Sequence, residues 1–138
     1  MRALTIEQMK VLKEKGLDYS KAASLCWVNI SYVDEYGDKV LIRKDALIDF
    51  DEDGEIYPDE IDVIQPTLTL EDILKLLPNI IKKKPYSYNF TLDHTNKGWC
   101  IYYTEGMEAL DGNFIDSDNL LQAAYDMLIW CLDNRYLK

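Results

Sequence analysis

Two segments of the chain combine the chemistry of a helix start with apolar residues at helical spacing. Thr5 is the predicted cap of a first helix, with Gln8 three residues later as its reciprocal hydrogen-bonding partner, and Gly16 is its predicted end. Thr69 repeats the arrangement at the start of a second, short helix, and Pro78 prevents that helix from continuing.

A third helix is predicted near the end of the chain. Asp116 is its expected cap, with Ile115 and Leu120 placed as a hydrophobic staple, and the helical pattern continues to Asn134. The stretch 123–132 is apolar on nearly all sides, with only Asp126 interrupting it. We therefore expect this helix to pack deeply against a sheet.

Between the helices the hydrophobic period changes to two, which is typical of strands. Residues 26–32 alternate and are followed by a turn at 34–38, where Gly37 can take a positive φ, and by a returning strand at 40–43. A second hairpin is predicted from residues 86–93 and 99–104. The order α-ββ-α-ββ-α predicts an α+β fold with a mostly antiparallel sheet and helices packed on one face, built as a single domain over residues 1–138.

The charge of the chain is concentrated in one segment. The 138 residues carry 25 acidic and 15 basic side chains, a net charge of −10, and 48% of them are hydrophobic, enough for a folded core. Residues 45–62, between the first hairpin and the second helix, contain nine carboxylates and no Lys or Arg, which leaves −1 for all the rest. The acidity makes nucleic acid an improbable partner, because phosphate binding depends on clustered Lys and Arg.

The cysteines and the N-terminal region favour a cytoplasmic protein. Cys26, Cys100 and Cys131 are too few and too far apart for a disulfide framework or a zinc site. The first residues carry charges throughout and lack the apolar core of a signal peptide, and no apolar run is long enough to span a bilayer. We expect neither export nor membrane insertion, and the sequence leaves the oligomeric state open.

The acidic segment contains the spacing of a calcium-binding loop. From Asp49 it matches D-x-[DN]-x-[DN]-G-x5-E, with Gly54 at the turn position. The implied calcium ligands are Asp49, Asp51, Asp53, the Glu55 carbonyl, a water-mediated contact at Tyr57, and both oxygens of Glu60. Residues 49–60 thus resemble an EF-hand loop, although a strand is predicted before the loop and Pro58 departs from the usual pattern. The alternative is a solvated acidic turn without a metal.

A docking surface for a basic protein is the main interpretation of the same segment. Carboxylates about 6 Å apart repel by roughly 0.7 kcal/mol per pair even in water, so their accumulation calls for a cation or a basic partner. The carboxylates assigned to docking are Asp45, Glu52, Asp59 and Asp62. A further alternative is mimicry of nucleic-acid charge, which the short extent of the segment disfavours.

No catalytic residue is predicted, and we expect a non-enzymatic protein. His94 is the only histidine, so a Cys–His nucleophile would need it beside Cys26 or Cys100. The residues around His94 read instead as a hairpin turn, and the cysteines as small hydrophobic residues. The six glycines form no phosphate-binding loop.

About half of the chain carries a resemblance to a known protein family. The residues concerned are Thr5, Glu7, Gln8, Met9, Leu12, Gly16, Asp18, Ser20, Lys21 and Ala22; Thr69, Leu70, Asp72, Ile73, Leu74, Leu77 and Pro78; and Leu120, Leu121, Ala123, Ala124, Tyr125, Met127, Leu128, Trp130, Asn134 and Tyr136. They resemble the pattern of an uncharacterised family of small proteins encoded by prophages and mobile elements of gut anaerobic bacteria. The resemblance implies a cytoplasmic, mobile-element setting and supplies no activity; the acidic segment lies outside it.

Overall fold

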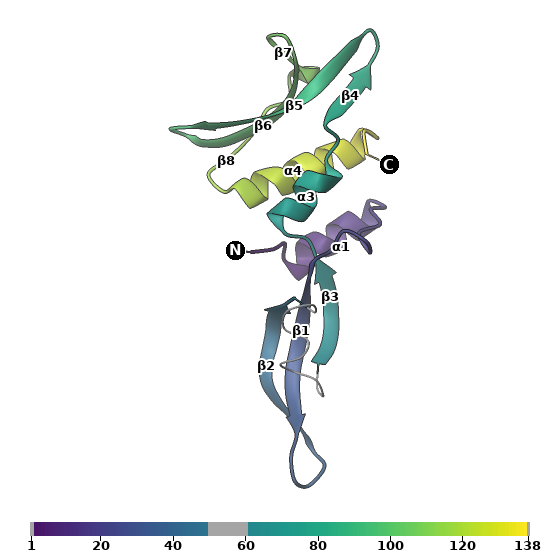
Figure 1. The fold of residues 1–138 in the computed structure, drawn as a ribbon, viewed down its shortest axis with the longest axis vertical. Helices are drawn as coiled ribbons and strands as arrows, with labels where there is room; N and C mark the ends of the chain where they lie inside the picture. Colours follow the sequence, from purple (N-terminus) through teal and green to yellow (C-terminus); the bar gives the residue numbers. More distant parts are fainter. Residues whose placement is uncertain (1, 50–60, 138) are drawn as a thin grey trace.

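The computed structural model describes residues 2–49 and 61–137, and it has an elongated, two-part shape (Figure 1). A body of three helices and a five-stranded sheet occupies one end, and a narrow three-stranded sheet extends from it. We call residues 25–49 and 61–67 the arm, and the other described residues the body. The fold is α+β with antiparallel sheets, as the sequence predicts.

Along the chain, all described strands of the arm sheet precede all described strands of the body sheet. They are α1 (Ile6–Glu14), β1 (Leu25–Val33), β2 (Lys39–Ile48), β3 (Ile61–Thr67), α3 (Leu70–Leu76), β4 (Ile80–Lys83), β5 (Tyr86–Thr95), β6 (Gly98–Glu105), β7 (Glu108–Ala109), the 3-10 turn η1 (Leu110–Gly112), β8 (Ile115–Ser117) and α4 (Leu120–Asp133). The sheet orders are β2-β1-β3 in the arm and β4-β5-β6-β7 in the body, where β8 also pairs with β6.

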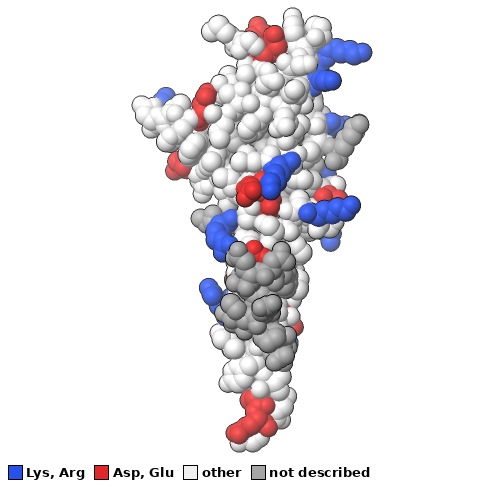
Figure 2. Space-filling model, viewed as in Figure 1, with Lys and Arg blue, Asp and Glu red and all other residues white. Residues whose placement is uncertain are grey.

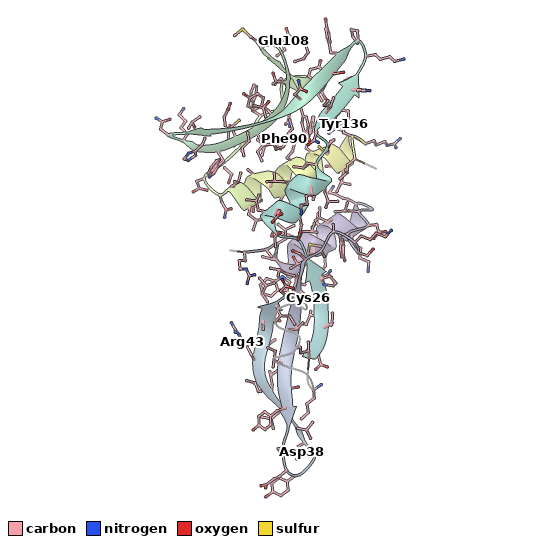
Figure 3. All side chains as sticks on the ribbon, in the orientation of Figure 1. Cys26, Asp38, Arg43, Phe90, Glu108 and Tyr136 are labelled. Atoms are coloured by element: carbon pink, nitrogen blue, oxygen red, sulfur yellow. The ribbon has the colours of Figure 1, made fainter. Side chains whose placement is uncertain are left out.

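The core of the body lies between the five-stranded sheet and its helices. One side of α4 is fully buried, including Met127 and Leu128, and it faces Ile101 and Tyr103 of β6 in a single apolar cluster. Phe90 of β5 meets Tyr103 edge-on with ring centroids 5.6 Å apart, and it lies between the sheet and α4 (Figure 3). The apolar helix of the sequence therefore packs against a sheet as predicted.

The first two predicted helix starts are confirmed as capping boxes. The Thr5 hydroxyl accepts from the Gln8 amide at 3.1 Å while the Gln8 side chain accepts from the Thr5 amide at 2.9 Å. Thr69 and Asp72 form the same reciprocal pair. Helix α1 ends as predicted, because Gly16 has a φ of 89° and the helix closes with backbone hydrogen bonds from Gly16 to Lys13 and from the next residue to Leu12.

The predicted start of the third helix is wrong by three residues. Asn119 caps α4, with its side-chain oxygen accepting from the Gln122 amide at 3.2 Å. Asp116 instead lies in β8 opposite Cys100, and Ile115 lies opposite Ile101. Both Asp and Asn are good caps, and the pairing of β8 with β6 keeps the chain extended until Asn119.

The arm has a small apolar cluster of its own. Cys26, Val28 and Ile30 of β1 are buried together with Ala46 and Ile48 of β2. These residues share one face, because Cys26 is paired with Ile48 and Val28 with Ala46 across the β1–β2 hairpin. The arm thus has a core separate from that of the body.

The expected single sheet is in fact two sheets, and four strands were not anticipated. The most consequential is β3, which follows the acidic segment and pairs with β1 on the side opposite to β2. Its sequence includes Pro66, which argues against a central strand but is tolerated in an edge strand. The segment 45–62 accordingly overlaps the end of β2 and the beginning of β3.

The arm and the body are joined by buried polar contacts around one backbone carbonyl. The Leu4 carbonyl accepts from the Trp27 indole at 2.8 Å and from the Thr67 hydroxyl at 2.7 Å, and both donors belong to the arm. The Leu4 amide donates to the Leu68 carbonyl at 2.9 Å. The N-terminal segment is thereby hydrogen-bonded to the arm both where the chain enters it and where the chain leaves it.

Asp72 provides a second connection at this junction. One of its carboxylate oxygens accepts from the Ser24 hydroxyl at 2.6 Å, the Ser24 amide at 3.1 Å and the Thr69 amide at 2.9 Å. Ser24 immediately precedes β1, so one buried carboxylate both caps α3 and fixes the entrance to the arm.

Replacing Asp72 should therefore destabilise the protein far more than replacing its exposed neighbour Glu71. In Asp72→Ala three donors lose their acceptor, and we expect the free energy of unfolding to fall by about 2–3 kcal/mol. Glu71 forms an exposed ion pair with Lys75 at 3.1 Å. Glu71→Ala should change stability by less than about 0.5 kcal/mol. Urea denaturation followed by circular dichroism measures both, and equal losses would contradict the junction's importance.

Candidate interaction surface

Large hydrophobic side chains are exposed along most of the arm. Seven of them come from its three strands and its hairpin tip: Tyr32, Val33, Tyr36, Leu41, Ile42, Val63 and Ile64. The rest of the described chain exposes five, namely Ile80, Tyr86, Leu92, Met107 and Phe114. An apolar concentration of this kind on a protruding element is typical of an interaction surface.

These side chains are presented on both faces of the arm. Val63 lies opposite Val28 in the β1–β3 pairing, so it shares the face of the small apolar cluster. Leu41 lies opposite Ser31 in the β1–β2 pairing, on the other face. A partner that covers both residues would have to reach around an edge of the sheet.

The hairpin tip holds an exposed tyrosine in a well-defined turn. One oxygen of Asp34 accepts from the Tyr36 amide and from the Asp38 amide, both at 2.9 Å. The Asp34 amide donates to the Asp38 carbonyl at 2.9 Å, and Gly37 adopts a φ of 83°. Tyr36 is 82% exposed at this tip, and the Asp38 label in Figure 3 marks how far the tip lies from the body. An ordered, exposed aromatic residue is a typical anchor for a protein partner.

The net charge is distributed unevenly along the sequence. Residues 25–67 contain twelve acidic and three basic residues, a net charge of −9, whereas the rest of the chain contains thirteen and twelve, a net charge of −1. Figure 2 shows acidic side chains at the distal tip, and basic and acidic side chains mixed over the body. The described part of the arm holds six of these acidic residues and all three basic ones, so its surface is both apolar and acidic.

Asp45 and Asp62, two of the predicted docking carboxylates, lie on the strands that flank Asn29 of β1. Asp62 of β3 is paired with Asn29, and the Asn29 side chain accepts from the Asp45 amide of β2 at 3.0 Å. Asp45 has a φ of 52° and belongs to a bulge, because the β1–β2 register shifts between Val28 and Ile30. Asp62 is paired with Lys39 at 2.6 Å, so its charge is partly compensated.

The predicted calcium ligands are described only at Asp49. This residue follows β2 and lines a cavity of about 350 Å³ together with Ser24, Cys26 and Pro66. The remaining predicted residues of the segment lie outside the described residues: Asp51, Glu52, Asp53, Glu55, Tyr57, Asp59 and Glu60. Strands β2 and β3 border this stretch, where an EF-hand has helices.

Neither a metal-binding cluster among the described residues nor a similarity to a known protein assigns a function to this surface. Within residues 2–49 and 61–137, no three His, Cys, Asp or Glu side chains form a group able to hold a metal ion. No protein-family model matches the chain, and no curated protein or solved structure is significantly similar to it. No helix in the described part of the chain has the length and apolarity needed to cross a membrane.

His94 and Cys100 are kept apart by the pleat of the sheet. Asp93 is paired with Cys100 and His94 with Trp99, so the histidine and the cysteine point to opposite faces. His94 stacks on Trp99 with ring centroids 4.1 Å apart. Burial, the adjacent Asp116 and the charge of Asp93 raise the pKa of the Cys100 thiol to about 11. The Cys26 thiol, in the arm, has a pKa raised by burial.

The exposed arm residues were missed by sequence reasoning, although the sequence contains a signal for them. Leu41 and Ile42 are adjacent in β2, and Val63 and Ile64 are adjacent in β3. Because successive side chains of a strand alternate between faces, adjacent apolar pairs in a thin sheet expose apolar surface unless both faces are covered. The sequence alone does not reveal that the described helices all pack in the body and leave this sheet uncovered by any of them.

Cys100 should be a poor nucleophile. At pH 8, iodoacetamide should modify it roughly 10- to 100-fold more slowly than an unstructured cysteine, because so little thiolate is present. Asp116→Asn removes a neighbouring charge, lowers the pKa and should speed the reaction severalfold. Timed alkylation and mass spectrometry of the Cys100 peptide at pH 8 and pH 10 give both rates, and a rate equal to that of a free cysteine at pH 8 would refute this environment.

Proposed function

We propose that this chain is a non-enzymatic protein–protein interaction module that binds a basic partner protein through its arm and acidic segment. The observation that carries the proposal is the exposure of seven large hydrophobic side chains on the arm. An apolar surface of this kind is stabilised when a partner removes it from water, at about 25 cal/mol for each Å² buried.

The charge of the arm indicates the chemistry of the partner. Almost all of the net charge of the chain belongs to residues 25–67. A field of one sign accelerates encounter with an oppositely charged partner and discourages like-charged ones, including a second copy of the same arm. A basic surface with apolar groups fits both properties of the arm.

The binding energy is expected to concentrate on a few arm residues. Asp34 holds the backbone amide of Tyr36 at the tip, so little backbone entropy is lost when the residue binds a partner. Leu41 and Ile42 are 55% and 60% exposed and come from the same hairpin. Residues with these properties dominate interfaces, while the surrounding charged residues set specificity and association rate.

A selection for binding peptides tests the proposal directly. A random peptide library displayed on phage and selected on the full chain should become enriched in net-positive peptides. Their affinity should fall at least 10-fold for a Leu41→Thr, Ile42→Thr variant, because the apolar contact is lost while the propensity for strand structure is retained. Affinity should also fall as salt is raised from 50 to 500 mM.

The matched control is a body residue. Met107 is fully exposed, and Met107→Thr should leave the affinity unchanged. Thermal melting of each variant confirms that the arm remains folded. Selection of neutral or acidic peptides, or equal affinity for the arm variant and wild type, would reject the arm as the binding surface.

Calcium binding is a second candidate function, supported by the loop spacing of residues 49–60. A bound cation would stabilise the folded state by mass action. Thermal melting in millimolar calcium, in chelator and in magnesium separates the candidates. A midpoint raised by calcium alone supports the cation site, and an unchanged midpoint leaves the basic partner as the compensating charge.

The proposed setting is the cytoplasm and a mobile-element programme. Cys26, Cys100 and Cys131 are free thiols, which is typical of a reducing compartment. The resemblance to the prophage-encoded family supports the second part of this setting. In such a setting a small anionic module acts by occupying or recruiting a basic protein.

A further inference from the structure

A cavity of about 310 Å³ lies where the start of α1 meets the arm. It is lined by Thr5, Ile6 and Glu7 at the beginning of the helix and by Trp27 of β1 and Asp45 of β2. Figure 1 shows that α1 is the helix nearest to the arm. The cavity thus brings together an aromatic ring, an aliphatic side chain and two carboxylates at the boundary between the arm and the body.

Trp27 is fixed in position by its indole nitrogen. The indole N–H donates to the Leu4 carbonyl at 2.8 Å, so the ring is held against the N-terminal segment. Its side chain lies on the face of β1 opposite to Cys26 and Val28, because successive side chains of a strand alternate between faces. With its one hydrogen-bond donor used, the ring can offer a ligand only apolar and π contacts.

The two carboxylates belong to exposed residues on different elements. The Glu7 side chain is 81% exposed, and its ion pair with Lys10 is long, at 3.4 Å. An exposed pair of this kind contributes little and can be replaced by another cation. Asp45 is also exposed, and its backbone is held in the bulge by the hydrogen bond from its amide to Asn29. Among the described residues that line the cavity none is basic, so the lining as a whole is anionic.

We infer that this cavity binds an arginine side chain of the basic partner. The inference rests on the proposed function and names the chemical group that is recognised. The alkyl part of the arginine would pack against Ile6 and the Trp27 ring, and the guanidinium would donate hydrogen bonds to the carboxylates of Glu7 and Asp45. The free energy of binding would come from apolar contact, cation–π attraction and charge together.

The mixed lining favours arginine over other ligands. An anion is repelled by the two carboxylates, and a neutral aliphatic side chain gains nothing from them. The ammonium of lysine is a compact, strongly hydrated charge. The guanidinium is planar and more weakly hydrated, stacks on aromatic rings, and has five donors that can reach two acceptors at once. Arginine is therefore the basic side chain that uses both the ring and the carboxylates.

Blocked pentapeptides with one central residue between glycines test the cavity on the full chain. The central residue is arginine, lysine or citrulline, which keeps the shape of arginine and replaces the guanidinium with a neutral urea. Nuclear magnetic resonance follows the Ile6 methyl and Trp27 indole signals during each titration. The arginine peptide should shift both signals to saturation, the lysine peptide should bind more weakly, and the citrulline peptide should bind at least roughly 10-fold more weakly than arginine.

Neutral variants of the two carboxylates locate the bound guanidinium. Glu7→Gln and Asp45→Asn should each weaken binding of the arginine peptide roughly 5- to 10-fold, because a charge-assisted hydrogen bond is lost. Asp45 has a φ of 52°, a conformation that Asn also accepts, so the bulge is retained. Glu14→Gln is the matched control, since Glu14 is an exposed residue at the other end of α1. It should change the affinity less than about twofold.

The possible results separate failure of the cavity from failure of the proposed function. Equal affinity for the arginine and citrulline peptides, or an equal loss in the Glu14 variant, would overturn recognition of a cation in the cavity. Unchanged Ile6 and Trp27 signals, with phage-selected peptides still binding to the arm, would overturn the cavity and leave the proposed function intact. Failure of the arginine peptide and of the phage selection would overturn both. Shifts of the same signals with protein concentration alone would show that a second copy fills the cavity, and would overturn the assignment to a different protein.

Discussion

The fold depends on hydrogen bonds at the junction, which hold the arm to the body where the chain enters the arm and where it returns. The carbonyl of the fully buried Leu4 accepts from Trp27 near the start of β1 and from Thr67 at the end of β3. Asp72 binds Ser24, which precedes β1, and caps α3, which follows β3. These donors and acceptors are costly to leave unpaired away from water, so they fix where the chain leaves the body and where it returns. The orientation of the arm is set by a few polar contacts as well as by apolar packing.

This arrangement separates the main apolar core from the exposed apolar surface. The body places its longest helix against the five-stranded sheet, and its large core includes side chains from all three described α-helices. The arm buries five residues in its own cluster and leaves seven large hydrophobic residues exposed. Residues 25–67 account for −9 of the net charge of −10, so in the sequence most of the charge imbalance falls outside the segments that build the main core.

Local features could be predicted from the sequence, and features that depend on long-range pairing could not. The caps at Thr5 and Thr69, the turn at Gly37 and the strand β5 are encoded within a few residues, and each is confirmed. The division into two sheets and the strand β3 depend on which distant segments pair, which periodicity does not specify. Asp116 shows the same limit. It is a good capping residue, but its pairing with Cys100 places it in a strand. The candidate surface could be predicted only in part. Its acidic residues Asp45 and Asp62 were predicted, whereas its exposed apolar residues depend on a sheet that none of the described helices covers.

The small separate cluster of the arm has a consequence for motion. Regions with few buried apolar contacts open by local unfolding at a lower free energy than the global transition, often as contiguous units. The cluster of Cys26, Val28, Ile30, Ala46 and Ile48 is the apolar core of such a unit, and the contacts of Leu4 and Asp72 form its boundary with the body. The arm can therefore open locally while the helices remain packed. Local opening of this kind lets the sheet of the arm rearrange without unfolding of the whole molecule.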